Sequence, residues 1–105
     1  MFVVIYQFDV VENKDDNFIK AWKRFTESIY QYEGSLGSRL HKNKDGKYIA
    51  YAQWPNRETW SNSGNKLPDK AKEEGIVMRE YCLNVQVLFE LDGIEDLLRD
   101  TIWDS

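Results

Sequence analysis

The sequence predicts an α+β fold whose strands and helices follow the order β-α-β-β-α-β. Three observations predict it. The chain has 105 residues, the size of a single domain, and we expect residues 1–105 to form one. Its hydrophobic period switches between strand-like and helix-like, and an Asp-Gly turn joins two of the strand-like segments. This order is the ferredoxin-like arrangement, an antiparallel sheet with helices on one face.

The first half of the chain begins with a strand followed by a long helix. Residues 2–8 (FVVIYQF) are β-branched and aromatic with little alternation, which is typical of a strand covered on both faces. Over residues 15–32 the period becomes helical, and we expect Asn13 to cap this helix and Gly34 and Gly37 to end it. Its apolar stripe consists of Phe18, Trp22, Phe25 and Ile29.

The centre of the chain predicts a hairpin and a short helix. Residues 38–42 and 47–54 are expected to form two strands joined by residues 43–46 (NKDG), where Asp-Gly supplies the left-handed backbone of a tight turn. Pro55 cannot donate to a sheet ladder, so it is expected at the entry to a short helix over residues 56–62.

The last third predicts a second long helix and a closing strand. The helix restarts at residues 67–69, and Gly75 weakens it, because glycine inside a helix costs about 1 kcal/mol relative to alanine. Residues 85–91 predict the closing strand. The side chains expected on the buried side of the helix are Ala71, Ile76, Met78 and Cys82. The side chains expected to pack as a last helical turn are Ile94, Leu97 and Leu98.

Composition excludes several classes of protein. The formal net charge of −4 argues against a dedicated nucleic-acid binder, which needs clustered Lys and Arg. The longest apolar run, residues 2–6, is far shorter than a membrane span. One Cys and one His exclude a zinc site built from these residues alone. Since a single Cys cannot form an internal disulfide and the N-terminus has no leader pattern, we expect a cytoplasmic protein.

Aromatic side chains are abundant for so small a core, with 4 Trp, 6 Tyr and 5 Phe. Both faces of the first strand are largely apolar: one carries Phe2, Val4, Tyr6 and Phe8, and the other carries Val3, Ile5 and Gln7. Helices would cover only one face of such a sheet. The simplest cover for the other face is the identical sheet of a second copy, and we therefore expect a homodimer through the sheet face.

The third predicted strand carries the best indication of a pocket. Its side chains on one face are Tyr48, Ala50, Ala52 and Trp54, so two small residues lie between two large rings. This arrangement leaves a hollow, which either forms a pocket or is filled by the helices. Trp60 follows on the next helix, where it is either a wall of that pocket or ordinary core.

The chain offers few other groups for chemistry. His41 is the only imidazole, and it is either a proton acceptor near neutral pH or a surface residue of the hairpin. Cys82 has no sequence feature that would lower the pKa of its thiol, and we expect it to be a small buried hydrophobe. Gly34 and Gly37 fit neither a dinucleotide-binding nor a P-loop spacing.

The central segment resembles the antibiotic biosynthesis monooxygenase family. The resemblance lies in residues 34–36 (GSL), in His41 before the Asp-Gly at 45–46, and in residues 51–54 (YAQW). Residues 87–91 (VLFEL) are similar to the closing strand of that family. The resemblance implies a dimeric α+β barrel. It also implies oxidation of polycyclic phenols, anthrones or quinols by molecular oxygen without flavin, haem or metal, so no cofactor is expected.

The resemblance also assigns roles to residues. Trp54 matches a strand-end Trp that forms a pocket wall and donor, His41 matches a His near the pocket, and Trp60 stands where an aromatic residue is expected. In such a site a deprotonated phenol passes one electron to oxygen, and the protein mainly binds, orients and desolvates the substrate.

Some positions depart from the family pattern. Ala50 stands where active members can have Asn, and Glu74 stands where an Arg is found, although Arg79 lies about one turn further on. Haem-degrading relatives use an Asn on the first strand and a His on the second helix. Gln7 falls near that Asn, but no His follows His41, so haem ligation in that manner is not expected.

Two functions from different classes follow. The first is a cofactor-independent monooxygenase acting on a small aromatic molecule, with catalytic His41 and Trp54. Its substrate-binding residues are predicted to be Tyr48, Ala50, Ala52, Trp60 and Arg79. The alternative is a non-catalytic dimeric barrel that binds a small hydrophobic ligand or has a stress or regulatory role, which the Ala at position 50 favours. A third interpretation makes residues 94–103 a contact arm in a larger assembly.

Overall fold

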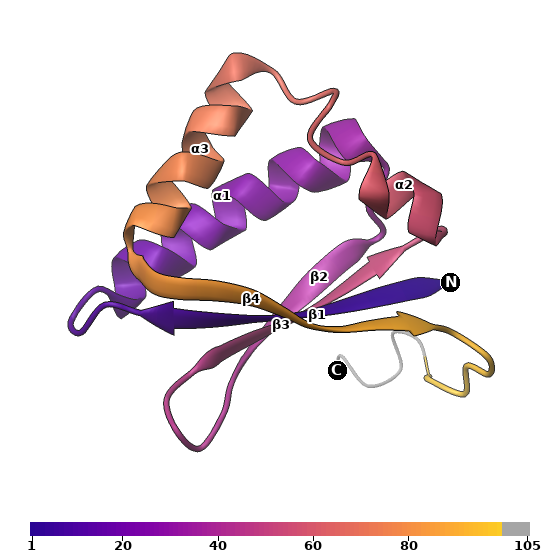
Figure 1. Cartoon of the computed structure of the whole chain (residues 1–105), viewed down its shortest axis with the longest axis horizontal. Helices are drawn as coiled ribbons and strands as arrows, with labels where there is room; N and C mark the ends of the chain where they lie inside the picture. The colour runs from indigo at the N-terminus through magenta and orange to yellow at the C-terminus, as the bar shows by residue number, and fades with distance from the viewer. Residues whose placement is uncertain (100–105) are drawn as a thin grey trace.

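Four antiparallel strands in the spatial order β2-β3-β1-β4 form one sheet, with the helices on one side of it (Figure 1). The structure is a computed structural model that describes residues 1–99. In chain order the elements are β1 (Phe2–Val10), α1 (Asp15–Glu33), β2 (Gly37–Lys42), β3 (Tyr48–Trp54), α2 (Arg57–Ser61), α3 (Asp69–Glu80) and β4 (Cys82–Asp92). The predicted α+β class with ferredoxin-like topology is confirmed.

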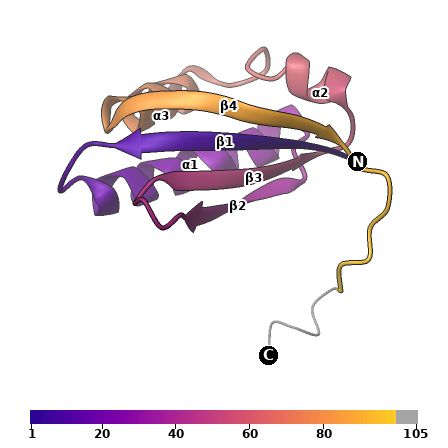
Figure 2. The same ribbon diagram turned by 60° about the horizontal axis from the view of Figure 1, so that its bottom comes forward.

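The two long helices lie side by side over the same face of the sheet (Figure 2). Gly75 sits where α3 meets α1, and a Cβ atom at this position would lie 2.7 Å from Cε1 of Phe25. Glycine therefore weakens α3 as an isolated helix but lets the two helices approach each other. On α3 the buried residues Ala71, Gly75 and Met78 follow a helical period. The prediction that Ile76 is buried is wrong: it lies off that stripe and is 56% exposed.

The start of α1 differs from the prediction. Asn13 lies in the left-handed region with φ 68° and does not cap the helix, because Lys14 occupies the cap position and the cap has no side-chain hydrogen bond. The end of α1 is as expected, since Gly34 adopts φ 78° and terminates it. In α2 the Asn56 carboxamide accepts from the Thr59 amide at 2.8 Å, so a side chain caps this short helix.

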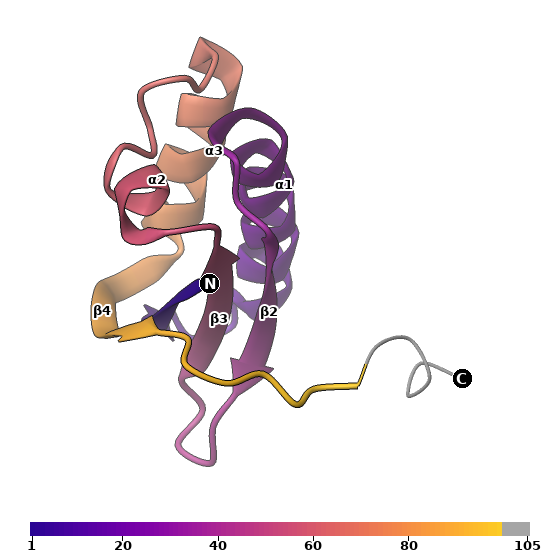
Figure 3. The same cartoon turned by 90° about the vertical axis from the view of Figure 1, so that its right-hand side faces the viewer.

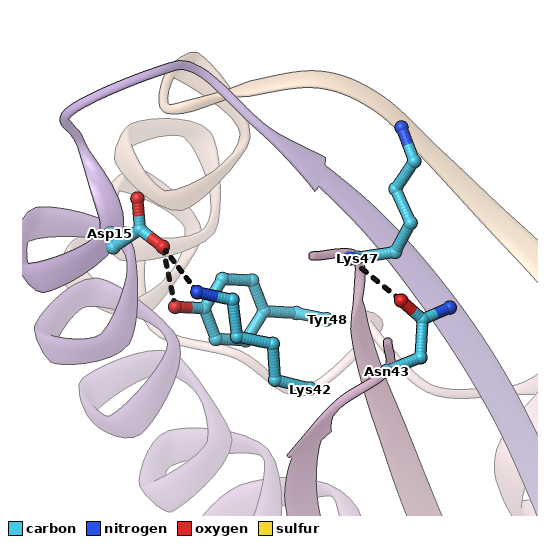
Figure 4. Close-up of polar contacts among 5 residues, drawn as sticks. All are labelled: Asp15, Lys42, Asn43, Lys47 and Tyr48. Atoms are coloured by element: carbon cyan, nitrogen blue, oxygen red, sulfur yellow. Dashed lines mark hydrogen bonds and ion pairs between the residues drawn. The ribbon is translucent and has the colours of Figure 1, made fainter. Parts of the chain in front are cut away.

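The hairpin between β2 and β3 forms as predicted. The side-chain oxygen of Asn43 accepts a hydrogen bond from the Lys47 amide at 2.9 Å (Figure 4). It also accepts one from the Asp45 amide at 3.0 Å, and Gly46 adopts φ 82°. This turn sets a register in which Leu40 pairs with Ala50. Because paired residues share a face, the hairpin decides which side chains of β2 meet the helices.

The helix-free face of the sheet carries a row of apolar side chains, as expected from the first strand. Across three strands, Ile5 is aligned with Tyr51 and Phe89, and Phe89 is 58% exposed. The opposite face, with Phe2, Val4, Tyr6 and Phe8, packs against the helices. One side of the sheet thus forms the core while the other presents apolar side chains without cover from any helix. Among residues 1–99, no helix is long and apolar enough to cross a membrane.

The segment after β4 does not form the predicted helical turn. Residues 94–99 are irregular, and Ile94 and Leu97 are 88% and 89% exposed. Figure 3 shows this segment leaving the end of β4 and running away from the helices. So short a segment cannot meet the cost of helix nucleation without packing. The rest of the predicted contact arm lies outside the described residues. Cys82, predicted on the second long helix, instead begins β4.

Candidate functional site

A cavity of about 230 Å³ lies between the sheet and the helices. Its floor on β3 is formed by Ala50 and Ala52, which are 2% and 7% exposed, and Trp54 also lines it. Two methyl side chains in a row leave space that larger residues would fill. The hollow expected from the alternation of this strand is therefore present in the structure.

The roof of the cavity comes from both long helices. Trp22, Phe25 and Ile29 contribute from α1, and Met78 and Arg79 from α3. Trp22 and Phe25 of the predicted apolar stripe pack against the core and also line the cavity. Phe18 of the same stripe is fully buried and packs between Phe8 and Tyr48, with ring centroids 5.1 and 5.2 Å away. The helix stripe thus passes from solid core to cavity wall along its length.

The segment between α2 and α3 closes one side of the cavity with Ser63, Gly64 and Leu67. Glu33 at the end of α1 anchors this segment. Its Oε2 accepts hydrogen bonds from the Gly64 amide at 2.7 Å and the Lys66 amide at 3.0 Å, and Glu33 is only 6% exposed. A buried carboxylate with two amide donors is a strong local attachment, so the cover over the cavity is held in place.

Trp54 carries a buried donor without a partner. The residue lines the cavity and is 3% exposed, and its Nε1 has no hydrogen-bond partner among the described residues. An indole N–H can only donate, and leaving such a group buried without an acceptor costs about 1–3 kcal/mol. Trp54 therefore gives the cavity an aromatic wall and holds an unsatisfied donor within that wall.

A second polar group comes from Tyr6 on β1, which lies opposite Ala50 and lines the cavity. Its Oη accepts a hydrogen bond from Nε1 of Trp60 at 2.8 Å. Trp60 itself is not a wall of the cavity but packs on Phe2, with ring centroids 5.7 Å apart. Burial raises the pKa of the Tyr6 hydroxyl, while the hydrogen bond from Trp60 opposes this shift. Tyr6 is accordingly a neutral hydroxyl at physiological pH.

Arg79 provides the only formal charge among the lining residues. It lies on the exposed side of α3 and forms no ion pair with another described residue. Its charge acts to lower the pKa of the Tyr6 hydroxyl, which places the guanidinium within electrostatic range of that group. A cation at the rim of an apolar cavity favours a ligand that carries a negative oxygen.

Tyr48 and His41, also predicted for the site, lie elsewhere. Tyr48 is buried beside the start of α1, where its hydroxyl donates to Oδ2 of Asp15 at 2.7 Å, and Lys42 Nζ lies 3.4 Å from the same oxygen (Figure 4). His41 pairs with Ile49, so it occupies the helix-free face and is exposed. The structure thus brings together Ala50, Ala52, Trp54 and Arg79, with Trp60 behind Tyr6, but leaves Tyr48 and His41 outside the cavity.

Other groups in the described part of the chain offer little chemistry. Burial, with a smaller contribution from Asp9, raises the pKa of the Cys82 thiol to about 11, so it is not a thiolate nucleophile at neutral pH. No cluster of three His, Cys, Asp or Glu side chains that could hold a metal ion occurs among residues 1–99. The donors that face the cavity are neutral or cationic, and such donors recognise an oxygen-bearing ligand.

Comparison with known proteins identifies the family. A sequence model of the antibiotic biosynthesis monooxygenase family matches residues 1–65. The chain belongs to this family. The resemblance seen in the sequence is therefore confirmed, and the matched region includes the cavity floor, Trp54 and Trp60. No curated protein gave a significant match.

Solved structures agree with this family fold. SnoaB from Streptomyces nogalater, a cofactor-independent oxygenase, superposes with a TM-score of 0.74 at 12% identity, covering 93% of this chain and 97% of SnoaB. Rv0793 from Mycobacterium tuberculosis superposes with a TM-score of 0.71 at 12% identity, covering 92% of this chain and 98% of its own. At such identities these likenesses show the fold that this chain shares with them.

Sequence reasoning missed Tyr6 as part of the site. The information was present in two places, because the strand alternation puts Tyr6 on the same face as Phe2 and Phe8, and the paired strands align it with Ala50. A large polar-tipped ring opposite a methyl group indicates that the hydroxyl has room beside it. The contact with Trp60 is 54 positions away in sequence and had no local pattern to reveal it.

Proposed function

We propose that this chain is a cofactor-independent monooxygenase that oxidises a small aromatic molecule of the phenol, anthrone or quinol type with molecular oxygen. The observation that carries the proposal is a cavity of about 230 Å³ lined mainly by apolar side chains, with Trp54, whose buried N–H lacks a partner, in its wall. Apolar walls bind the rings, and a few placed donors bind an oxygen substituent. Membership of the family supports the oxygenase chemistry.

The size of the cavity favours the smaller members of this substrate class. A cavity of about 150 Å³ accommodates one benzene ring. The present cavity, about 230 Å³, therefore suits two fused rings. A three-ring anthrone would require the cover formed by Ser63, Gly64 and Leu67 to open. We accordingly favour a bicyclic phenol or quinol over an anthrone.

The substrate can supply all of the electrons for this reaction. One atom of O₂ becomes a carbonyl oxygen on a ring carbon, and the other leaves as water with the hydrogens of the substrate's C–H and O–H bonds. No lining residue is a carboxylate or an imidazole. The phenol therefore binds as its anion after losing its proton to water, Arg79 stabilises the negative oxygen, and Trp54 donates to an oxygen at the other end of the ligand. Excluding water around the ring then favours electron transfer to oxygen.

Oxygen uptake tests the proposal directly. The purified protein is incubated with 1-naphthol, 1,4-dihydroxynaphthalene and anthrone, and uptake is compared with buffer and with heat-denatured protein. We expect faster uptake with the two-ring compounds. Trp54→Phe should lower kcat/KM by about tenfold, the effect of one lost hydrogen bond, and the exposed control Tyr30→Phe should leave it unchanged. No uptake above buffer with any of the compounds would contradict the catalytic proposal.

The catalytic role of His41 stays a prediction. In a single chain it lies across the sheet from the cavity, on the helix-free face. His41→Ala tests the role: a lower rate at unchanged thermal stability supports it, and an unchanged rate contradicts it. Arg79→Gln is the companion variant, for which we expect a higher KM for the ionised substrate.

The alternative function is a non-catalytic barrel that binds a small hydrophobic ligand. Ala50 favours it, because the centre of the floor carries no polar group that could steady a reacting oxygen species. Binding of an aromatic compound without oxygen uptake would select this alternative. A single domain over residues 1–105 and a cytoplasmic location stay predictions.

We also propose that two copies associate through the helix-free face. Phe89 and Leu91 on this face are 58% and 46% exposed, and they adjoin Ile5 and Tyr51 of the same sheet. Burying these side chains against an identical sheet removes apolar surface from water. Analytical ultracentrifugation should show a dimer for the wild type and a monomer for Phe89→Glu. The control Tyr30→Glu, on the outer side of α1, should remain dimeric; a monomeric wild type would contradict the proposal.

A further inference from the structure

Tyr6 lines the cavity, and its hydroxyl accepts one hydrogen bond but donates none to a described residue. It lines the cavity from β1, directly across the strand pair from Ala50. The small side chain opposite leaves open space beside the phenol ring. No other tyrosine lines this cavity in the part of the chain that the structure describes.

The hydrogen bond to Tyr6 leaves its own proton available. A phenolic hydroxyl both accepts and donates, whereas an indole N–H only donates. Because Trp60 Nε1 donates to Tyr6 Oη at 2.8 Å, the tryptophan cannot accept the Tyr6 proton. Within residues 1–99, the hydroxyl of Tyr6 donates to no other group. The pair therefore presents one free O–H donor.

Trp60 holds this hydroxyl in a defined position. Its indole ring packs against Phe2, and its backbone amide bonds to the carbonyl of Asn56, the residue that caps α2. A donor held at the oxygen restricts where the remaining O–H bond can point. Preorganisation of this kind reduces the entropy lost when a ligand binds.

The charges around Tyr6 keep its hydroxyl a donor. Burial raises the pKa of the phenol, and the carboxylate of Glu90 acts in the same direction. Glu90 is itself paired with Arg57, while Arg79, which also lines the cavity, has the smallest effect on this pKa and lowers it. A neutral O–H beside a guanidinium suits a neutral or anionic oxygen acceptor on the ligand.

We infer that the Tyr6–Trp60 pair is the recognition element for an oxygen atom of the bound aromatic molecule, with Tyr6 as donor and Trp60 as positioning residue. Ala50 is the partner of Tyr6 in the sheet, and Trp54 lies four residues after Ala50 on the same strand. The backbone positions of Tyr6 and Trp54 are therefore about 13 Å apart along the strand direction. The two donors therefore reach different parts of the ligand. This inference shares the cavity with the proposed function but requires only binding, not turnover.

Paired probes that differ in one oxygen atom test the inference. The probes are 1-tetralone, a two-ring ketone that only accepts hydrogen bonds, and tetralin, which lacks the oxygen. Dissociation constants are measured by calorimetry on the full chain. Tyr6→Phe should weaken 1-tetralone binding by about tenfold, the effect of one hydrogen bond, and change tetralin binding by less than about twofold. Tyr30→Phe is the control and should change neither.

Trp60→Phe separates positioning from direct contact. It should weaken 1-tetralone binding by about three- to fivefold in the wild-type background and by less than about twofold in the Tyr6→Phe background, as expected for two coupled residues. Independent losses in the two backgrounds would overturn the positioning role. Equal weakening of both probes by Tyr6→Phe, or no weakening, would overturn the donor role.

Infrared spectroscopy of 1-tetralone bound to the wild-type protein gives a further test, which does not depend on whether a variant folds. The carbonyl stretch of bound 1-tetralone should lie at lower frequency than in hexane, where nothing donates to it, and a stretch at the hexane value or binding of neither probe would overturn the inference. Its failure is distinguishable from failure of the proposed function. If the protein binds 1-tetralone more tightly than tetralin but shows no oxygen uptake, the inference is supported and catalysis is contradicted. If it takes up oxygen but binds the two probes equally, catalysis is supported and the inference is contradicted.

Discussion

Two tyrosines on neighbouring strands face the same side of the sheet but have different surroundings. The hydroxyl of Tyr48 donates to Asp15 at 2.7 Å, and its ring packs against Phe18. The hydroxyl of Tyr6 accepts from Trp60 and donates to no described residue, and its ring borders the cavity. At one end of the helix-covered face the side chains are closely packed and the Tyr48 hydroxyl is hydrogen-bonded within the chain. At the other end a cavity remains, and the Tyr6 hydroxyl has no acceptor among the described residues.

The difference shows how one layer of side chains serves both stability and recognition. Where polar groups find partners within the chain, they fix the structure. Where a buried donor such as Trp54 Nε1 lacks a partner, the group is retained at a cost in stability. The packed end therefore gives rigidity to the strands, and these strands carry the cavity at the other end.

The largest effect is expected from removing a ring at the packed end. Phe18 is fully buried, so Phe18→Ala should lower the free energy of unfolding by about 3–5 kcal/mol through lost burial and a new void. Urea unfolding measures it. The neighbouring residue Ile19 is 39% exposed, and Ile19→Ala should cost less than about 1.5 kcal/mol. Similar losses for both variants would contradict the division into a packed and a hollow end.

A smaller effect on stability is expected when the cavity end is filled. Ala52 lines the cavity, so the added carbons of Ala52→Leu occupy existing space, and the free energy of unfolding should change by less than about 1 kcal/mol. The same variant should weaken 1-tetralone binding by at least about tenfold. The matched control is Ala21→Leu in the packed cluster, which should cost about 1–3 kcal/mol by overpacking. Equal costs at both positions would show that the cavity cannot take a larger side chain.

Much of this division could be predicted from the sequence. The alternation of Tyr48, Ala50, Ala52 and Trp54 locates the floor of the cavity, and the family motif indicates its use. The face of the sheet on which His41 lies could also be predicted, because the Asn43 turn sets a register that pairs His41 with Ile49 rather than with Ala50. Pairing across the hairpin, more than residue type, decides which side chains share a face.

Other features depend on tertiary contacts that no local pattern encodes. The Tyr6–Trp60 hydrogen bond joins β1 to α2, and the Glu33 carboxylate holds backbone amides more than 30 positions away. The apolar spacing in residues 94–98 is helical, but so short a segment, with Ile94 and Leu97 almost fully exposed, does not form a helix. Gly75 weakens α3 locally and is required by the ring of Phe25 on another helix.

The smallest expected effect is a difference in pH dependence at the packed end. The hydrogen bond from Tyr48 holds the pKa of the Asp15 carboxyl below its usual value, and the same bond raises the pKa of Tyr48 to about 12. The stability that Asp15 contributes is present above its unfolded pKa, near 4, and is lost as pH falls through the lower folded value. The contribution of Tyr48 is present below about pH 10 and is lost as pH rises toward 12.

Tyr48→Phe preserves the ring but removes the Tyr48 contribution and the largest cause of the Asp15 shift, leaving the ion pair of Asp15 with Lys42. Urea midpoints measured from pH 2 to pH 11 should therefore decline less for Tyr48→Phe than for the wild type at both extremes. Asp15→Asn in the wild-type background should reproduce the flatter acid side, because the group that titrates there is gone. Parallel curves for wild type and Tyr48→Phe would mean that the Tyr48 hydroxyl, like that of Tyr6, has no committed acceptor in the folded chain, and the contrast between the two tyrosines would fail.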